Sequence, residues 1–134
     1  MPEKTTIERA HEDELEGKAP TTQAGEFVRE EMEHIRRGKH GARSTKQAIA
    51  IGLSKARRAG VPLKPPRKGT TSERTRRSAE RAYEFGQGRK PRAASRKRSA
   101  ATARALRREG KRAASRPALS AQARRAAAKR RARR

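Results

Sequence analysis

Large apolar residues are concentrated in the first half of this 134-residue chain, and their spacing there predicts two helices. In the first, over residues 22–37, they recur three or four positions apart and share one side of a helix: Ala24, Phe27, Val28, Met32 and Ile35. The opposite side is acidic and is expected to face solvent: Glu26, Glu30 and Glu33. Proline and glycine in the segment before this helix predict a break in helical structure there, and Gly38 is suited to end the helix.

The second predicted helix covers residues 45–59, within the stretch "STKQAIAIGLSKARRAG". Ser44 and Gln47 have the spacing of a capping box, and Gly60 followed by Pro62 ends the pattern. One side is apolar: Ala48, Ile49, Gly52, Leu53, Ala56 and Ala59, with Ile51 beside it. Gly52 on that side indicates a close approach of two helices, so residues 21–61 are predicted to form a helical hairpin.

The remaining segments are shorter or less apolar. Residues 1–20 form an acidic segment with a short helix over 5–16, capped by Thr5 or Thr6 and ended by Gly17. Its expected apolar stripe is thin: Ile7, Ala10 and Leu15. Residues 62–70 are a proline-rich hinge. Residues 71–86 predict a helix that either docks on the hairpin or stays free, and docking is the favoured role for Tyr83 and Phe85.

Residues 87–134 are low in complexity and consist mostly of arginine, alanine, lysine and serine. Alanine and arginine favour helix, but repulsion between close cations opposes it. We therefore expect a largely disordered tail that becomes partly helical when bound phosphates screen its charge. Candidate helix caps in it are Ser95, Ser99, Ser115 and Ser120, and Pro117 suits the first turn of a helix. The predicted fold class is mainly α: a helical hairpin or three-helix head followed by this tail.

Charge indicates the kind of partner. The chain is 39% charged and 2% aromatic, with a net charge of +24. Residues 1–35 contain 4 Lys or Arg and 10 Asp or Glu, whereas residues 86–134 contain 19 and 1. An acidic head joined to a strongly basic tail predicts a polyanionic partner.

Other classes of protein are disfavoured by composition. No cysteine is present, so disulfides and thiolate metal sites are excluded. The N-terminus lacks the apolar segment of a secretory signal, and the longest apolar run, "AIAIGL", is too short for a membrane span. We expect a cytoplasmic protein with no membrane insertion.

Catalysis is not expected either. His11, His34 and His40 lack the i, i+4 spacing of a helical metal site. His34 belongs to a helix and His40 to a glycine-containing loop, so the two are expected to point in different directions and face solvent. With so small a core, no pocket is expected around the carboxylates. The sequence predicts no enzyme activity, metal, cofactor or small-molecule substrate.

Nucleic-acid binding fits these residues better. Arginine binds phosphate bidentately and enters narrow minor grooves, and about ten phosphate contacts give a log–log salt slope near −9 on duplex DNA. DNA is favoured over RNA, in a nucleoid-associated role; an RNA- or ribosome-associated factor and a protein-interaction adaptor are the alternatives. The candidate binding residues are Lys46, Arg57, Arg58, Arg89, Lys90, Arg92, Arg96, Lys97, Arg98, Arg104, Arg107, Arg108, Lys111, Arg112, Arg116, Arg124, Arg125, Lys129, Arg130, Arg131, Arg133 and Arg134.

The hairpin allows three further hypotheses. Its second helix presents Lys46, Gln47, Arg57 and Arg58 outward, as a recognition helix would, although the 38–44 connection is long for a helix-turn-helix. The acidic side of its first helix is a candidate for holding the basic tail. Pairing two hairpins would cover apolar stripes that one hairpin leaves open, so a homo-oligomer is a further candidate.

Residues 25–61, "EFVREEMEHIRRGKHGARSTKQAIAIGLSKARRAGV" and its flanks, resemble a domain of unknown function in small basic bacterial proteins. The "KQAIAIGLS" and "ARRAG" elements carry this resemblance, which implies a bacterial cytosolic protein and supplies no site residues. Separately, the tail is similar in composition to the tails of linker histones and bacterial histone-like proteins. It is richer in arginine than those tails and lacks a winged-helix head.

Overall fold

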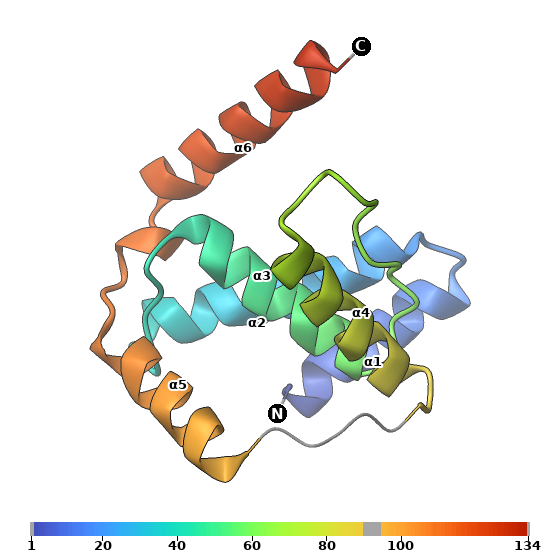
Figure 1. The fold of residues 1–134 in the computed structure, drawn as a ribbon, viewed down its shortest axis with the longest axis horizontal. Helices are drawn as coiled ribbons and strands as arrows, with labels where there is room; N and C mark the ends of the chain where they lie inside the picture. Colours follow the sequence, from blue (N-terminus) through green and yellow to red (C-terminus); the bar gives the residue numbers. More distant parts are fainter. Residues whose placement is uncertain (1, 90–94, 134) are drawn as a thin grey trace. The chain divides into compact units, whose positions relative to one another are not determined.

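A computed structural model describes residues 2–89 and 95–133. The predicted mainly helical class is confirmed, and within these ranges the only extended pairing is an isolated bridge between Lys68 and Thr71. The helices are α1 (Lys4–Leu15), α2 (Pro20–Arg36), α3 (Thr45–Arg58), α4 (Glu73–Gly86), α5 (Arg96–Arg108), the 3-10 turn η1 (Arg112–Ala114) and α6 (Arg116–Ala132) (Figure 1). None of the described helices is both long and apolar enough to cross a membrane.

The chain forms two compact units. The first unit comprises Met1–Glu30 and Ala50–Ala93, and the second comprises Glu31–Ile49 and Ala94–Arg134. Since α2 and α3 each cross a boundary between these segments, both helices contribute residues to both units.

The two hairpin helices have the predicted ends. Ser44 accepts the N–H of Gln47 at 3.1 Å, and the Gln47 side chain accepts the N–H of Arg43 at 2.7 Å, which gives a variant of the predicted capping box. The predicted break before α2 is present over residues 16–19, but the helix begins at Pro20 instead of residue 22, because proline suits a first turn, where no N–H partner is needed. Gly25 is accommodated inside α2.

Close helix packing explains Gly52. A Cβ at this position would lie 2.7 Å from the Cα of Val28, so only glycine permits this separation of α2 and α3 in the first unit. The core beside it is small and consists largely of alanine: Ala10, Ala24, Phe27, Ala56 and Val61, with Leu53 and Leu63 packed against them. The chain therefore covers these hairpin residues itself, which removes the predicted reason for pairing two hairpins here.

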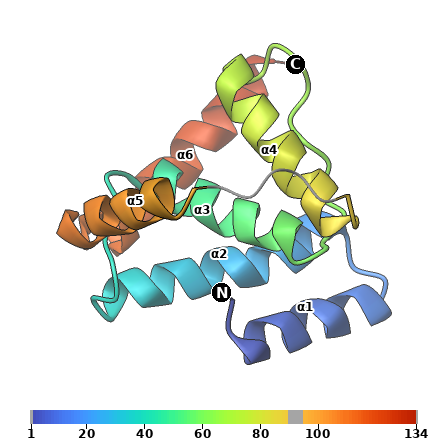
Figure 2. The ribbon, with the colours of Figure 1, turned by 60° about the horizontal axis from the view of Figure 1, so that its bottom comes forward.

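Helix α1 packs on α2 through a different face from the one expected (Figure 2). Its buried residues are Thr6, Ala10 and Asp13, whereas Ile7 and Leu15 are 45% and 74% exposed. Small side chains at the contact allow a close approach, and Asp13 bonds to the ammonium of Lys18 at 3.1 Å. Glu3 begins the helix without a side-chain cap, so the predicted threonine cap is wrong.

Helix α4 is present as predicted but docks through alanines. Ala79 and Ala82 are buried, while Phe85 is 52% exposed, so the expected docking role of Phe85 is wrong. The last residue, Gly86, lies so close to the Arg57 carbonyl that a Cβ there would be 1.7 Å from its oxygen. Backbone contact at a glycine thus substitutes for a large apolar anchor.

In the second unit, helices occupy most of the segment predicted to be disordered. Ser95 accepts the N–H of Arg98 and caps α5; Ser115 accepts the N–H of Ala118 and caps α6, whose first turn contains Pro117. These two of the four candidate serine caps are confirmed. The disordered tail is not observed, because alanine and arginine have high helix propensity and the caps satisfy free N–H groups.

Candidate functional site

Helix α5 carries a stripe of cations. Successive residues of an α-helix are about 100° apart, so five basic side chains fall within an arc of about 120°: Arg96, Lys97, Arg104, Arg107 and Arg108. All five are exposed, whereas Leu106, which lies across the helix from the stripe, is half-buried. The stripe spans about 18 Å at 1.5 Å per residue, which is the length of about ten duplex phosphate charges.

Helix α6 is cationic around most of its circumference toward its C-terminal end, and no residue of it is buried. Its exposed cations are Arg116, Arg124, Arg125, Lys129, Arg130 and Arg131, with Arg133 directly after the helix. Within the described parts of α5 and α6, no carboxylate pairs with a basic side chain. The cations therefore face solvent without an internal counter-charge.

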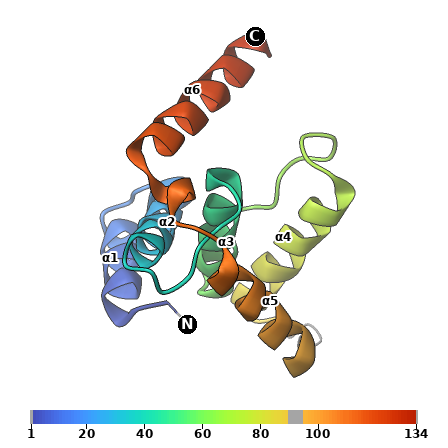
Figure 3. The same ribbon diagram turned by 90° about the vertical axis from the view of Figure 1, so that its left-hand side faces the viewer.

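Backbone carbonyls at the end of α5 and in the segment before α6 accept hydrogen bonds from the end of α2, the hairpin loop and the start of α3 (Figure 3). Gly41 donates its N–H to Leu106 O at 2.8 Å, and Ala42 donates to Gly110 O at 3.2 Å. Farther along, Arg36 Nε donates to Ala114 O at 3.2 Å, and the Thr45 hydroxyl donates to Ala113 O. Since Ala113 and Ala114 are buried, these bonds satisfy carbonyls that water cannot reach.

The structure sorts the predicted nucleic-acid-binding residues into three groups. Those outside the described residues are Lys90, Arg92 and Arg134. Arg57 is contradicted as a binding residue because it is 7% exposed. The remainder are exposed: Lys46, Arg58, Arg89, Arg96, Lys97, Arg98, Arg104, Arg107, Arg108, Lys111, Arg112, Arg116, Arg124, Arg125, Lys129, Arg130, Arg131 and Arg133.

Arg57 has a structural role within the first unit. Its guanidinium donates from Nε to Leu63 O at 3.0 Å and from Nη2 to Lys64 O at 3.3 Å, which fixes the proline-rich segment after α3. Burial lowers the pKa of Arg57 from its ordinary value. With Arg57 buried and Gln47 used as a cap, α3 lacks two of the four side chains proposed for a recognition helix.

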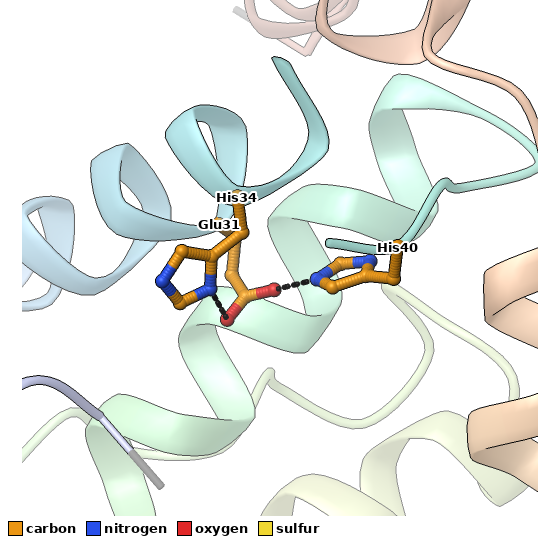
Figure 4. A group of neighbouring side chains, drawn as sticks. All are labelled: Glu31, His34 and His40. Atoms are coloured by element: carbon orange, nitrogen blue, oxygen red, sulfur yellow. Dashed lines mark hydrogen bonds and ion pairs between the residues drawn. The ribbon is translucent and has the colours of Figure 1, made fainter. Parts of the chain in front are cut away.

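A second cluster involves side chains that were expected to face solvent. Glu31 is fully buried, and its Oε2 lies 2.9 Å from His40 Nε2. Its Oε1 lies 4.0 Å from Nδ1 of His34, one turn along α2. Figure 4 shows both imidazoles directed at the one carboxylate, with ring centroids 6.3 Å apart. The prediction that His34 and His40 point in different directions and face solvent is wrong, whereas His11 is exposed as expected.

The turn after α2 explains this convergence. The N–H groups of Gly38 and Lys39 donate to Ile35 O at 3.1 Å and His34 O at 3.0 Å, which is a Schellman motif. Gly38 has φ +79°, a conformation that favours glycine. The chain therefore turns back at the helix end and returns His40 to Glu31. The pairing of Glu31 with His34 at i, i+3 and a C-terminal glycine were the available sequence signals.

The acidic side predicted for α2 is also revised. Glu30 is 3% exposed and accepts the N–H of Glu3 at 2.6 Å, in the first unit. Glu26 is half-buried, and Glu33 keeps 40% of its side chain exposed. Because Glu30 is buried and Glu26 is half-buried, the solvated acidic side predicted for α2 is reduced largely to Glu33.

A cavity of about 100 Å³ lies in the first unit between α1, α2 and the end of α3, with Ile7, His11 and Phe27 among its lining residues. Typical small-molecule sites have volumes of about 300–1,000 Å³, so this cavity is small by comparison.

Part of this chain matches a known protein family. Residues 21–69 match a family of unknown function (DUF6496). The match includes the residues 25–61 whose resemblance to a domain of unknown function was predicted, and it ends before α4. No curated protein and no solved structure matches the chain. The Glu31, His34 and His40 cluster lies inside the matched stretch, whereas α5 and α6 lie outside it.

Proposed function

We propose that this protein binds nucleic acid through the arginine-rich helices α5 and α6, largely without regard to sequence, as a DNA-associated protein of the nucleoid rather than an enzyme. The observation that carries the proposal is the stripe of five exposed cations on α5. Guanidinium groups bind phosphate oxygens bidentately, and the alanines between them leave room for a phosphate backbone. No aromatic residue lies in α5 or α6 to stack on bases, which favours a duplex over a single strand.

The binding is expected to be electrostatic and strongly salt-dependent. Each phosphate neutralised on duplex DNA contributes about −0.9 to the log–log slope of affinity against salt. Five contacts from α5 therefore give a slope of about −4.5, and contacts from α6 make it steeper. Sequence reading is not part of the proposal, because phosphate contacts position a protein without specifying bases.

The test is a salt titration of full-length protein on random duplex DNA and on matched duplex RNA, with a variant that removes Arg104, Arg107 and Arg108 by glutamine substitution. The control replaces three exposed arginines of α4, Arg74, Arg77 and Arg81, and so changes net charge equally. We expect the α5 variant to reduce the slope by about 2.7 and the control to reduce it much less.

Equal losses in the two variants would show that only net charge matters and would contradict an α5 interface. Tighter binding to RNA than to DNA at every salt concentration would transfer the proposal to an RNA-associated role. Unchanged binding in both variants would refute it.

A further inference from the structure

We propose that Glu31, His34 and His40 form a binding site for a divalent transition metal ion, with zinc as the first candidate. This inference is independent of the nucleic-acid proposal. All three residues lie in the second unit, on the last two turns of α2 and the loop that follows. The cluster offers two imidazole nitrogens and one carboxylate oxygen, a ligand set that proteins use for zinc with one coordination position left open.

The spacing of the donor atoms is close to what such an ion requires. One ligand atom from each residue lies within 4.8 Å of the others, and the Glu31–His40 and Glu31–His34 pairs are at 2.9 and 4.0 Å. Zinc bonds of about 2.0–2.1 Å in a tetrahedron place ligand atoms about 3.3 Å apart. Shifts of roughly 1 Å, within reach of ring and carboxylate rotations, would bring all three onto one ion.

The hydrogen bonding of His40 supplies an independent argument. Its Nδ1 lies 2.9 Å from the backbone oxygen of Gly41, so that nitrogen must carry the proton and donate. In the neutral ring Nε2 then has a lone pair, and it is Nε2 that faces Glu31. Histidines that bind a metal through one ring nitrogen commonly donate the other N–H to a backbone carbonyl, as His40 does to Gly41.

The three side chains of the cluster are largely removed from solvent. The Glu31 side chain is fully buried, and the side chains of His34 and His40 are only 10% and 17% exposed. A buried carboxylate is costly unless a positive group or several donors compensate it. A divalent metal ion held by the carboxylate and the two imidazole nitrogens would be one such positive group.

The location predicts a consequence for the second unit. His40 immediately precedes Gly41 and Ala42, whose N–H groups bond to the carbonyls of Leu106 and Gly110. An ion bridging α2 and His40 would fix the loop that carries these bonds. Metal binding is therefore expected to increase protection of the Gly41 and Ala42 amides from hydrogen exchange.

The experiment is a cobalt(II) titration of untagged full-length protein, without nucleic acid, followed by the visible absorption of low-symmetry cobalt and by displacement with zinc. We expect wild type to give a saturating spectrum at one equivalent and zinc to abolish it. His40→Gln and Glu31→Gln should each weaken binding by at least about 100-fold. His11→Gln changes an exposed histidine on α1 and should leave the titration unchanged.

Because Glu31 is buried, its substitution can perturb folding, and circular dichroism of each variant accompanies the titration. His40 lies in a loop, so His40→Gln is expected to keep the helix content while losing the metal. A zinc-dependent rise in the melting temperature of wild type, reversed by chelator and absent in His40→Gln, provides a second readout. Absence of a cobalt spectrum in wild type, or an equal loss in His11→Gln, would overturn the proposal.

Discussion

Replacing Gly41 with alanine tests how the basic segment is held in the second unit. A Cβ at this position would lie 2.0 Å from Glu109 O and 2.3 Å from Glu109 C, whereas ordinary contacts begin at 3.4 Å. Both obstructing atoms belong to the backbone, so no rotamer change relieves the overlap. The segment after α5 must move by about 1.4 Å, which breaks the bonds donated by Gly41 and Ala42.

The expected destabilisation in Gly41→Ala follows from the loss of these two bonds. Each contributes about 1 kcal/mol net, for a loss of about 2 kcal/mol. Replacing glycine also restricts the unfolded chain and returns about 0.4–1 kcal/mol. The expected net destabilisation of the docked segment is therefore about 1–2 kcal/mol, which corresponds to an increase of about 5- to 30-fold in the population with this segment undocked.

Native-state hydrogen exchange measures this population residue by residue. In wild type the amide of Ala42 should be protected; in Gly41→Ala its exchange should accelerate by about 5- to 30-fold, while the amide of Ala56 in the first-unit core should be unaffected. The matched control is Gly25→Ala, since a Cβ there meets no atom within 4 Å. Gly25 lies inside α2, so this control should stabilise the helix by about 1 kcal/mol.

Unchanged exchange at Ala42 in Gly41→Ala would refute the docking described for the second unit. A general acceleration that includes Ala56 would indicate unfolding of the whole chain and would contradict a local effect. The substitution removes no charge, so the salt slope of DNA binding should stay within error of wild type even when docking is weakened.

Three further predictions concern the first unit. Gly52→Ala should destabilise the hairpin by about 1–2 kcal/mol in urea unfolding despite a better helix propensity, because the new Cβ meets the Val28 backbone at 2.7 Å; a gain in stability would contradict the close approach. Arg57→Met should lower the free energy of unfolding by about 2 kcal/mol, because two hydrogen bonds to carbonyls are lost. DNA affinity should be unchanged, and a fall in affinity equal to that of an α5 arginine variant would contradict the buried role of Arg57. Hydrogen bonding to Arg76 lowers the pKa of Glu73. The stability that ionised Glu73 contributes to α4 is therefore present above its unfolded pKa and is lost as the pH falls through the lower folded pKa. NMR titration of the carboxyl carbon should show a lowered pKa in wild type and a higher one in Arg76→Gln.

The helices that carry apolar residues at regular spacing were predictable from sequence. Phe27 and Ile35 recur with the helical period, and a serine cap and a glycine mark the ends of the hairpin helices. Local signals sufficed here because caps and periodicity depend on residues within one or two turns. The role of Gly52 was also predictable, because a glycine on the apolar face of a helix usually indicates that another helix packs closely against it.

The burial of charged residues was not predictable in this way. Residue type alone would assign Glu31 and Arg57 to solvent, although the helical period places Glu31 on the apolar side of α2. The structure places imidazole partners beside Glu31 and carbonyl partners beside Arg57. Arg57 also has a long aliphatic stem that can pack while its end group bonds. These partners come from loop segments, Leu63 and His40, whose paths depend on turn geometry that a helical wheel does not contain.

The basic tail shows how a segment with almost no large apolar residues can be ordered. The part of the tail between α5 and α6 is held by the N–H groups of Gly41 and Ala42 and by the hydroxyl of Thr45. These groups donate to backbone carbonyls of residues 106–114. Such bonds need no particular side chain from the tail, only alanines and glycines small enough to let two backbones meet. The arginines are consequently left out of the docking contacts and remain exposed. A composition that looks unsuited to folding is thus compatible with an ordered segment, because the backbone forms the docking contacts and the arginine side chains stay exposed for the phosphate contacts that we propose.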